Sequence, residues 1–143
     1  MRKIIGFITL LCGFTALWAA DLPPPAAGAP ATHPLTGSWT WTLPGKQCRE
    51  TLKYGADGMR SGSSGEEVSK ARYEVSAMPS LLGFYRLEET TTESNGKRDC
   101  AGDLHDTSAG PVIRFIQFSP KRDQFIVCKE ESLKACFGPL KRQ

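Results

Sequence analysis

The sequence predicts an all-β fold, a small antiparallel meander of about seven or eight strands. Two observations support this prediction. Short segments alternate apolar and polar residues with a period of two, and turn signals recur roughly every 8–15 residues. No stretch of the mature chain has a convincing helical period. Strands of this length and spacing are typical of a closed barrel, with a β-sandwich as the alternative.

The N-terminal segment, residues 1–20, indicates export. Arg2 and Lys3 form a basic head, and residues 4–18 are an apolar run of about the length of a signal-peptide core. This run is shorter than the roughly 20 apolar residues that cross a bilayer. We therefore expect a cleaved signal peptide, a periplasmic or secreted protein, and no stable membrane insertion after cleavage. An uncleaved anchor is the alternative.

Residues 21–34 are predicted to be a linker. They hold five of the ten prolines together with several alanines, a composition that favours extended chain over a packed core. His33 lies in this segment, so we do not expect it to be a site residue. Residues 35–143, about 109 in number, are predicted to form a single all-β domain.

The charge of the mature chain argues against nucleic acid as a partner. The full sequence has 18 basic and 15 acidic residues, and loss of residues 1–20 leaves 16 and 15, a net charge of about +1. A nearly neutral domain lacks the basic footprint of a nucleic-acid-binding protein. Three basic pairs are expected to be solvated turn and tail charges: Lys97-Arg98, Lys121-Arg122 and Lys141-Arg142.

The four cysteines outside the signal segment predict two disulfides. An even count in an exported chain is typical of an oxidising compartment. Four cysteines allow three pairings; we favour Cys48–Cys100, a long-range link, with Cys128–Cys136, a local link across a turn. The rival is a metal site, but there is no C-x-x-C spacing and histidine is scarce. We expect no metal site and no cofactor.

The strands of the first half follow from alternation and turns. Trp39 and Trp41 alternate with polar residues, as do the apolar residues of 48–54. A turn is predicted at 56–58, followed by a weak and flexible segment at 59–67. The alternation of 71–75 predicts the next strand.

The second half contains the strongest hairpin signal, Asn95-Gly96, because both residues tolerate the positive φ of a type I′ turn. A strand is predicted to enter this turn from about residue 85, and a return strand to leave it over 97–104. Residues 102–111 are predicted to be a loop, and 112–119 and 123–130 two clear strands. Residues 131–139 are expected to turn back and end at Gly138-Pro139.

Gly37-Ser38-Trp39 resembles the G-x-W signature of the lipocalin-like barrels, including their short bacterial members. The following strand, the A-D-G turn and the Gly/Ser-rich segment are similar to those of the short bacterial members, so the resemblance covers the first third of the domain. It implies a barrel whose first strand carries Gly37 and in which Trp39 plugs one end under a basic residue. Arg122 and Arg142 are the candidates for that residue. The Trp39 N–H is expected to reach a nearby carbonyl.

A candidate pocket follows from the aromatic residues of the predicted strands. Trp41, Tyr54, Tyr73 and Tyr85 are expected to line a space for a small apolar ligand, although side chains filling a core would give the same pattern. Glu50 shares a strand face with Tyr54. If that face is the interior, Glu50 needs a partner such as an arginine.

The remaining polar residues predict no catalytic site. The three Glu-Glu pairs are neighbours in sequence, so on a strand their side chains point to opposite faces. The glycines around Ser63 do not form a nucleophile elbow. Residues 99–106 gather three carboxylates and His105, but their spacing matches no defined calcium loop and predicts a polar surface loop.

These observations predict an exported, non-enzymatic binding domain. The first hypothesis is a carrier of a small apolar ligand inside the barrel. The alternative is a module that binds or inhibits another protein of the cell envelope through the polar segments 58–67 and 102–111. A hydrolase using carboxylates from different strands is a third and weaker hypothesis.

Overall fold

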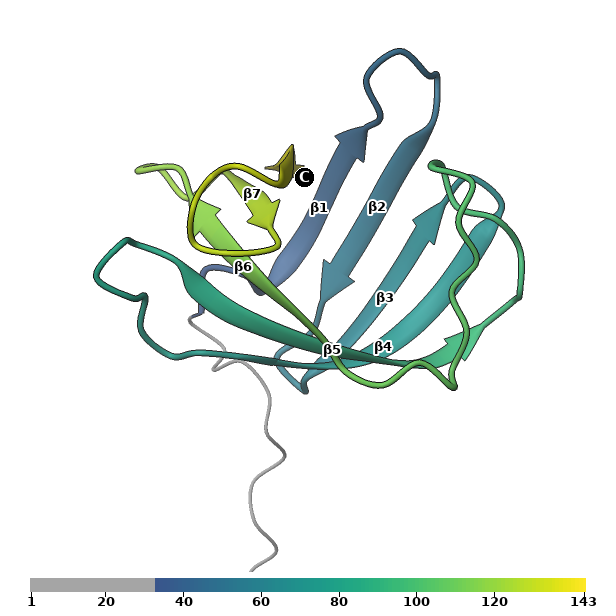
Figure 1. Ribbon diagram of the computed structural model, residues 1–143, viewed down its shortest axis with the longest axis horizontal. Coiled ribbons are helices and arrows are strands. Elements are labelled where there is room, and N and C mark those ends of the chain that lie inside the picture. The colour runs from purple at the N-terminus through teal and green to yellow at the C-terminus, as the bar shows by residue number, and fades with distance from the viewer. Residues whose placement is uncertain (1–32) are drawn as a thin grey trace, which may run out of the picture.

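The computed structural model describes residues 33–143 (Figure 1). The predicted signal peptide, residues 1–20, and residues 21–32 of the predicted linker lie outside the described residues. Within the described part, the regular structure is entirely β, and no helix there is long and apolar enough to cross a membrane.

Eight antiparallel strands form one closed barrel in which each strand pairs with its neighbours in the sequence (Figure 1). This confirms the predicted all-β meander and decides for the barrel over the sandwich. The strands are β1 (Gly37–Thr42), β2 (Arg49–Tyr54), β3 (Met59–Ser64), β4 (Glu67–Val75), β5 (Tyr85–Ser94), β6 (Val112–Phe118), β7 (Gln124–Cys128) and β8 (Cys136–Arg142).

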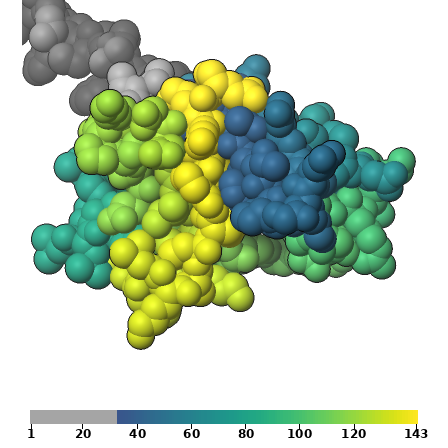
Figure 2. All heavy atoms as spheres, turned by 90° about the horizontal axis from the view of Figure 1, so that it is seen from above, coloured from purple at the N-terminus to yellow at the C-terminus, as the bar shows by residue number. Residues whose placement is uncertain are grey.

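The barrel is closed by pairing of β8 with β1, in which Trp39 lies opposite Arg142 and Thr40 opposite Lys141. In Figure 2 the yellow C-terminal segment runs beside the blue segment of β1. The expectation that residues 131–139 turn back and end the regular structure was wrong, because strand β8 begins at Cys136. Its alternation is interrupted by Gly138-Pro139, and pairing with β7 and β1 decides its conformation instead.

Two further segments differ from the sequence predictions. Residues 97–104 do not form a return strand; between β5 and β6 there is only an isolated bridge from Arg98 to Leu104. The disulfide at Cys100 ties this segment to Cys48 instead of letting it pair along β5. The segment at 59–67, expected to be weak and flexible, contains a regular strand, β3, which pairs with both β2 and β4.

Both predicted disulfides are present, Cys48–Cys100 with a sequence separation of 52 and Cys128–Cys136 with a separation of 8. The first joins the start of β2 to the long β5–β6 connection. The second joins β7 to β8, where the two cysteines are register partners. Two disulfides indicate an oxidising, extracytoplasmic environment.

The interior of the barrel has two different halves. The end that contains the start of β1, here called the closed end, is filled by large apolar side chains with little or no exposure. Its core consists of Leu35, Trp39, Tyr54, Tyr73, Leu87, Ile116, Phe125, Val127 and Leu140. The other end, here called the open end, carries polar residues at the inward positions, among them Glu50, Ser64 and Glu67.

Candidate functional site

Trp39 lies at the centre of the closed end and is fully buried. Its ring packs edge-on against Phe125, with 4.7 Å between the ring centroids, and tilted against Phe118 at 5.9 Å. The indole Nε1–H donates a hydrogen bond of 2.8 Å to the Leu35 carbonyl. This satisfies the one polar atom of the ring, so that Trp39 is buried without a desolvation penalty.

Arg142, the last residue of β8, covers the Trp39 ring at 4.2 Å from its centroid. Its guanidinium donates to the Pro34 carbonyl at 2.6 Å and to the Thr36 carbonyl at 3.0 Å. Of the two candidates for this role, Arg142 fills it and Arg122 does not; Arg122 contributes only a carbonyl that accepts from Arg142 Nε. Arg142 is therefore not the solvated tail charge that the sequence predicts.

The glycine of the G-x-W motif has a physical reason in this arrangement. Gly37 adopts a φ of +129°, a conformation that side chains rarely allow. A Cβ atom at this position would lie 2.7 Å from Nη1 of Arg142. Gly37, Trp39 and Arg142 thus form one unit in which the missing side chain leaves room for the guanidinium.

The residues of the predicted pocket lie on the inward faces of the strands, but they pack against one another and their neighbours. The rings of Tyr54 and Tyr73 make an edge-on contact at 5.0 Å, and both residues are at most 3% exposed. Tyr85 packs against Phe118 at the closed end. Trp41, half-buried, packs against Phe137 of β8 at 5.3 Å.

Two depressions of the described surface lie elsewhere. One, of about 190 Å³, is lined by residues of the β2–β3 hairpin and Lys70. The other, of about 270 Å³, lies along β4 and the end of β5, from Val68 to Asn95. Neither includes any of the five predicted pocket residues.

A charged network crosses the middle of the barrel. Arg60 Nε donates to Oε1 of Glu89 at 3.3 Å, and its Nη1 donates to the Ser69 hydroxyl at 3.0 Å. The Tyr54 hydroxyl donates to the same Glu89 oxygen at 3.2 Å. Burial, followed by the negative charge of Glu89, raises the pKa of Tyr54 well above its ordinary value. Interior polar groups of this kind disfavour a purely apolar guest.

Glu50 does face the interior, but its partner is not an arginine. Its Oε1 accepts a hydrogen bond of 2.7 Å from the Ser64 hydroxyl, which in turn accepts from the backbone N–H of Cys100 at 3.0 Å. Burial raises the pKa of Glu50, with the charges of Asp99 and Glu67 acting in the same direction. The hydrogen bond from Ser64 opposes this shift.

A second group of titratable residues lies beside Glu50 at the open end. Nδ1 of His105 lies 3.2 Å from Oε1 of Glu67 and 4.0 Å from Oδ2 of Asp99. The side chains of Glu67 and Asp99 are 7% and 10% exposed, whereas that of His105 is half exposed. Sequence reasoning placed Asp99 and His105 in a surface loop but could not connect them with Glu67, which comes from β4.

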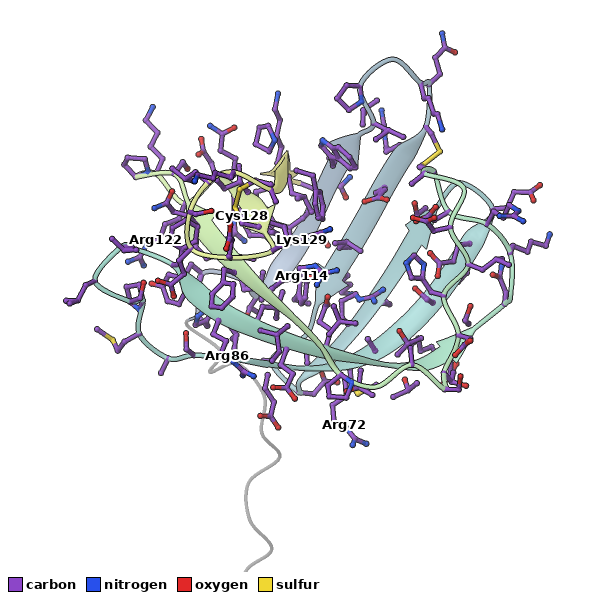
Figure 3. The ribbon with its side chains drawn as sticks, in the orientation of Figure 1. Arg72, Arg86, Arg114, Arg122, Cys128 and Lys129 are labelled. Carbon is purple, nitrogen blue, oxygen red and sulfur yellow. A yellow bond between two sulfur atoms is a disulfide. The ribbon has the colours of Figure 1, made fainter. Side chains whose placement is uncertain are left out.

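Glu88 and Glu89, both in β5, point to opposite faces of the strand, as the alternation predicts. Glu89 points inward to Arg60, while Glu88 pairs with the outward Arg86 at 2.6 Å. Figure 3 shows Arg86 and Arg72 directed away from the barrel, whereas Arg114 lies over its interior. Arg114 is the register partner of the buried Leu87, which agrees with its inward position.

An exposed apolar loop was missed by sequence reasoning. The connection between β4 and β5, residues 76–84, presents Leu81 with a fully exposed side chain, Met78 at 76% exposure and Leu82 at 62%. Pro79 signalled only a break in the chain. The absence of an alternating pattern around Met78, Leu81 and Leu82 was the available signal that these residues do not lie in a strand.

Ser80 organises this loop. Its backbone N–H donates to the Phe84 carbonyl at 2.7 Å, and its hydroxyl donates to Glu131 of the β7–β8 connection at 2.9 Å. The Leu82 carbonyl accepts from the side-chain amide of Gln117 on β6 at 3.0 Å. The loop is thus fixed to two other parts of the barrel while its apolar side chains point into solvent.

His33 is 5% exposed and packs edge-on against Tyr85 at 5.0 Å, although the sequence places it in the linker. Its Nδ1 accepts from the backbone N–H of Leu35 at 3.1 Å. Burial lowers the pKa of His33 because it disfavours the imidazolium form. His33 therefore belongs structurally to the closed end.

Comparison of the chain with protein-family models, curated proteins and solved structures finds no match to any of them. A functional interpretation therefore rests on the geometry of the described residues alone.

Proposed function

We propose that the chain is an exported, non-enzymatic binding domain that recognises a partner protein through the β4–β5 loop, residues 76–84. The exposure of Leu81, Met78 and Leu82 on a loop held in one conformation carries this proposal. Large apolar side chains gathered on a surface mark interaction sites, whereas single scattered ones do not. The partner is expected to offer an apolar pocket for Leu81.

The order of the loop strengthens this assignment. Binding orders side chains and loops at a free-energy cost, and a loop already fixed in its bound conformation reduces that cost. Ser80 and Gln117 supply this fixing through their bonds to Glu131 and to the Leu82 carbonyl.

Relationship to the lipocalin-like barrels is part of the same proposal. It is supported by the eight-strand meander, by Trp39 buried at one end, and by Arg142 of the last strand over its ring. Export to the periplasm or the medium is supported by the two disulfides and by the signal-like segment 1–20. Partner binding through outer loops is compatible with a barrel of this size whose interior is filled.

The first hypothesis from the sequence, a carrier of a small apolar ligand, has less support. Tyr54 and Tyr73 fill the space they were expected to line, and the inward positions above them are polar or charged. Of the two polar segments, 58–67 lies largely in β3, and 102–111 presents one large exposed apolar side chain, Leu104, whereas residues 76–84 present three.

A hydrolase also has less support. Glu50 lies near Glu67 and Asp99, but Glu50 is engaged by Ser64 and Glu67 by His105. Neither of the two depressions described above borders these carboxylates. A general acid and base acting on a substrate need such a space between them.

The experiment is site-specific photocrosslinking in the cells that export the protein. A photoreactive phenylalanine analogue replaces Leu81 and, as a matched control, Val68, which is 57% exposed on β4. We expect a protein adduct of discrete mass from position 81 and none from position 68. Affinity of the purified partner for Leu81→Ser should then fall at least tenfold below that for the wild-type chain.

Three results would contradict the proposal: no adduct at position 81, equal adducts at both positions, or a partner whose affinity is unaffected by Leu81→Ser. An adduct between two copies of this chain would replace the proposed partner by self-association.

A further inference from the structure

The side-chain cluster of Glu67, Asp99 and His105 offers a ligand set for a metal ion. Each residue presents one donor atom, and these three atoms lie within 4.8 Å of one another. Donors around a Zn²⁺ ion lie about 3–4 Å apart, since each metal–ligand bond is about 2.0–2.2 Å long. The half-exposed His105 can supply the small closing movement that is required.

Three carboxylates gather here without a lysine or arginine partner among the described residues. The only ion-pairing partner of Glu67 and Asp99 among the described residues is His105, and the Glu50 carboxylate is hydrogen-bonded to Ser64. Glu67 Oε1 faces His105, while no hydrogen bond from the described residues reaches its Oε2. Carboxylates with so little solvent contact normally have a cationic partner, because burial of an unpaired charge is costly.

Two basic side chains of this region donate to backbone carbonyls. Lys46 Nζ donates to the Cys100 carbonyl at 3.2 Å, and Arg98 donates to the Gly102 carbonyl. Both use backbone oxygens, and neither forms an ion pair with these carboxylates within 4.0 Å. The open end therefore holds a concentration of negative charge that only the His105 ring faces directly.

The loop that carries two of the three ligands is fixed in position. Cys100, next to Asp99, is linked to Cys48 and donates its N–H to Ser64. Asp99 Oδ1 accepts from the backbone N–H groups of Gly102 and Asp103 at 2.8 and 2.7 Å, so its Oδ2 is the oxygen left toward His105. Bonds that orient a ligand in this way support metal affinity.

Gly65 allows the loop to lie this close to the barrel. Its φ is +60°, and a Cβ atom there would lie 3.3 Å from the carbonyl carbon of Asp99 and from the nitrogen of Cys100. The turn between β3 and β4 thus brings Glu67 beside Asp99 by backbone contact. This juxtaposition joins β4 to the β5–β6 loop and could not be found from the spacing of residues 99–106 alone.

We propose that Glu67, Asp99 and His105 bind a divalent transition-metal ion, with water completing the coordination. One imidazole nitrogen with two carboxylate oxygens suits Zn²⁺ or Mn²⁺ better than Ca²⁺, which takes oxygen ligands. Because all four cysteines of the described chain are in disulfides, no thiolate competes for the ion. The site is independent of the proposed protein-binding loop.

The test is isothermal titration of the mature chain, residues 21–143, with ZnCl₂. The protein carries intact disulfides and no affinity tag, and it is first treated with EDTA and desalted. We expect one equivalent of Zn²⁺ to bind, and His105→Ala and Glu67→Gln each to weaken binding at least tenfold. Asp103→Asn, an exposed carboxylate in the same loop, is the matched control and should bind as the wild type does.

His105→Ala keeps the test decisive, because a half-exposed loop residue can be removed without loss of the fold, whereas Glu67 is buried. Absence of Zn²⁺ binding to the wild-type chain would overturn the proposal. So would a wild-type affinity in His105→Ala. A parallel titration with CaCl₂ that binds more tightly than Zn²⁺ and is unaffected by His105→Ala would overturn the choice of a transition metal.

Discussion

Trp39 and Trp41 lie two residues apart on β1 and point to the same side, yet their surroundings differ. Trp39 is fully buried among Phe125, Phe118 and the Arg142 guanidinium. Trp41 is only half-buried and packs against Phe137, which is itself 42% exposed. The boundary between the apolar closed end and the polar open end thus passes between two side chains of one strand.

This difference indicates a division of tasks within one barrel. The closed end buries the apolar area that stabilises a domain of about 109 residues. At the open end, charged side chains occupy inward positions, and a disulfide stabilises the structure in place of an apolar core. Substitutions and pH changes at the two ends should therefore change the free energy of unfolding by different amounts and, for pH, with opposite signs.

The largest effect is expected for Trp39→Ala. Removal of a buried tryptophan typically costs about 3–5 kcal/mol through lost burial and the cavity left behind, and here the Arg142 guanidinium also loses its aromatic face. The same substitution at Trp41 should cost about 1–2 kcal/mol, because that ring is half exposed. Urea unfolding of both variants measures the two losses of unfolding free energy. Equal losses would contradict the difference in packing between the closed and the open end.

Removal of the Cys48–Cys100 disulfide ranks next. The chain-entropy estimate for its 52-residue separation is a loss of about 4 kcal/mol, against about 2–3 kcal/mol for the eight-residue Cys128–Cys136 link. The double serine variants are compared by urea unfolding under non-reducing conditions. A larger loss from the Cys128–Cys136 pair would show that the open end does not depend on its long-range link.

Arg142→Leu is expected to cost about 1–2 kcal/mol. It removes hydrogen bonds to the Pro34 and Thr36 carbonyls and the contact with the Trp39 ring, in a partly solvated setting. Lys141→Leu, the outward neighbour, is the matched control and should be nearly neutral. Thermal unfolding followed by tryptophan fluorescence reports both effects, and an equal shift for the two variants would refute the capping role of Arg142.

The smallest effects are expected with pH, and the two ends should respond with opposite signs. The folded-state pKa of His33 is lowered, so the unfolded chain binds more protons and stability falls as the pH decreases through 6.5 and below. The folded-state pKa of Glu50 is raised, so the ionised Glu50 side chain lowers the free energy of unfolding at neutral pH. This destabilisation disappears below the ordinary pKa of glutamate, where the carboxyl is protonated in both states.

Unfolding free energies measured from pH 4 to pH 8 in EDTA test this contrast. Glu50→Gln should remove the part of the unfolding free energy that decreases with rising pH. His33→Asn should remove the part that increases with rising pH. If both variants altered the pH profile in the same direction, the assignment of the two groups to different environments would be wrong.

Much of the barrel could be predicted from the sequence because alternation and turns are local signals. Strands β1, β2 and β4 to β7 follow from such signals, as does the inward Trp39, whereas the alternation left open which face Glu50 takes. Strand β8 could not be found, because Gly138-Pro139 obscures its alternation and its pairing with β1 is a contact between the chain ends. The return strand over 97–104 was predicted from a good turn, but the Cys48 link decides that segment.

The candidate sites were less predictable because they depend on contacts between distant segments. Arg142 and Arg122 were equal candidates until the closure of β8 on β1 placed one of them over Trp39. Glu67 joins Asp99 and His105 only through the approach of the loop to Gly65. The local sequence does not show that Leu81 is exposed in the folded protein, because its exposure depends on which other segments pack over it.

Native mass spectrometry of the mature chain purified from an exported preparation tests the central claim most directly. The claim is that side chains fill the barrel interior and that recognition takes place on its outer loops. We predict the mass of residues 21–143 with two disulfides and no organic molecule bound. A co-purifying molecule of a few hundred daltons that disappears from Trp41→Ala, but not from Leu81→Ser, would contradict the claim and support a carrier barrel.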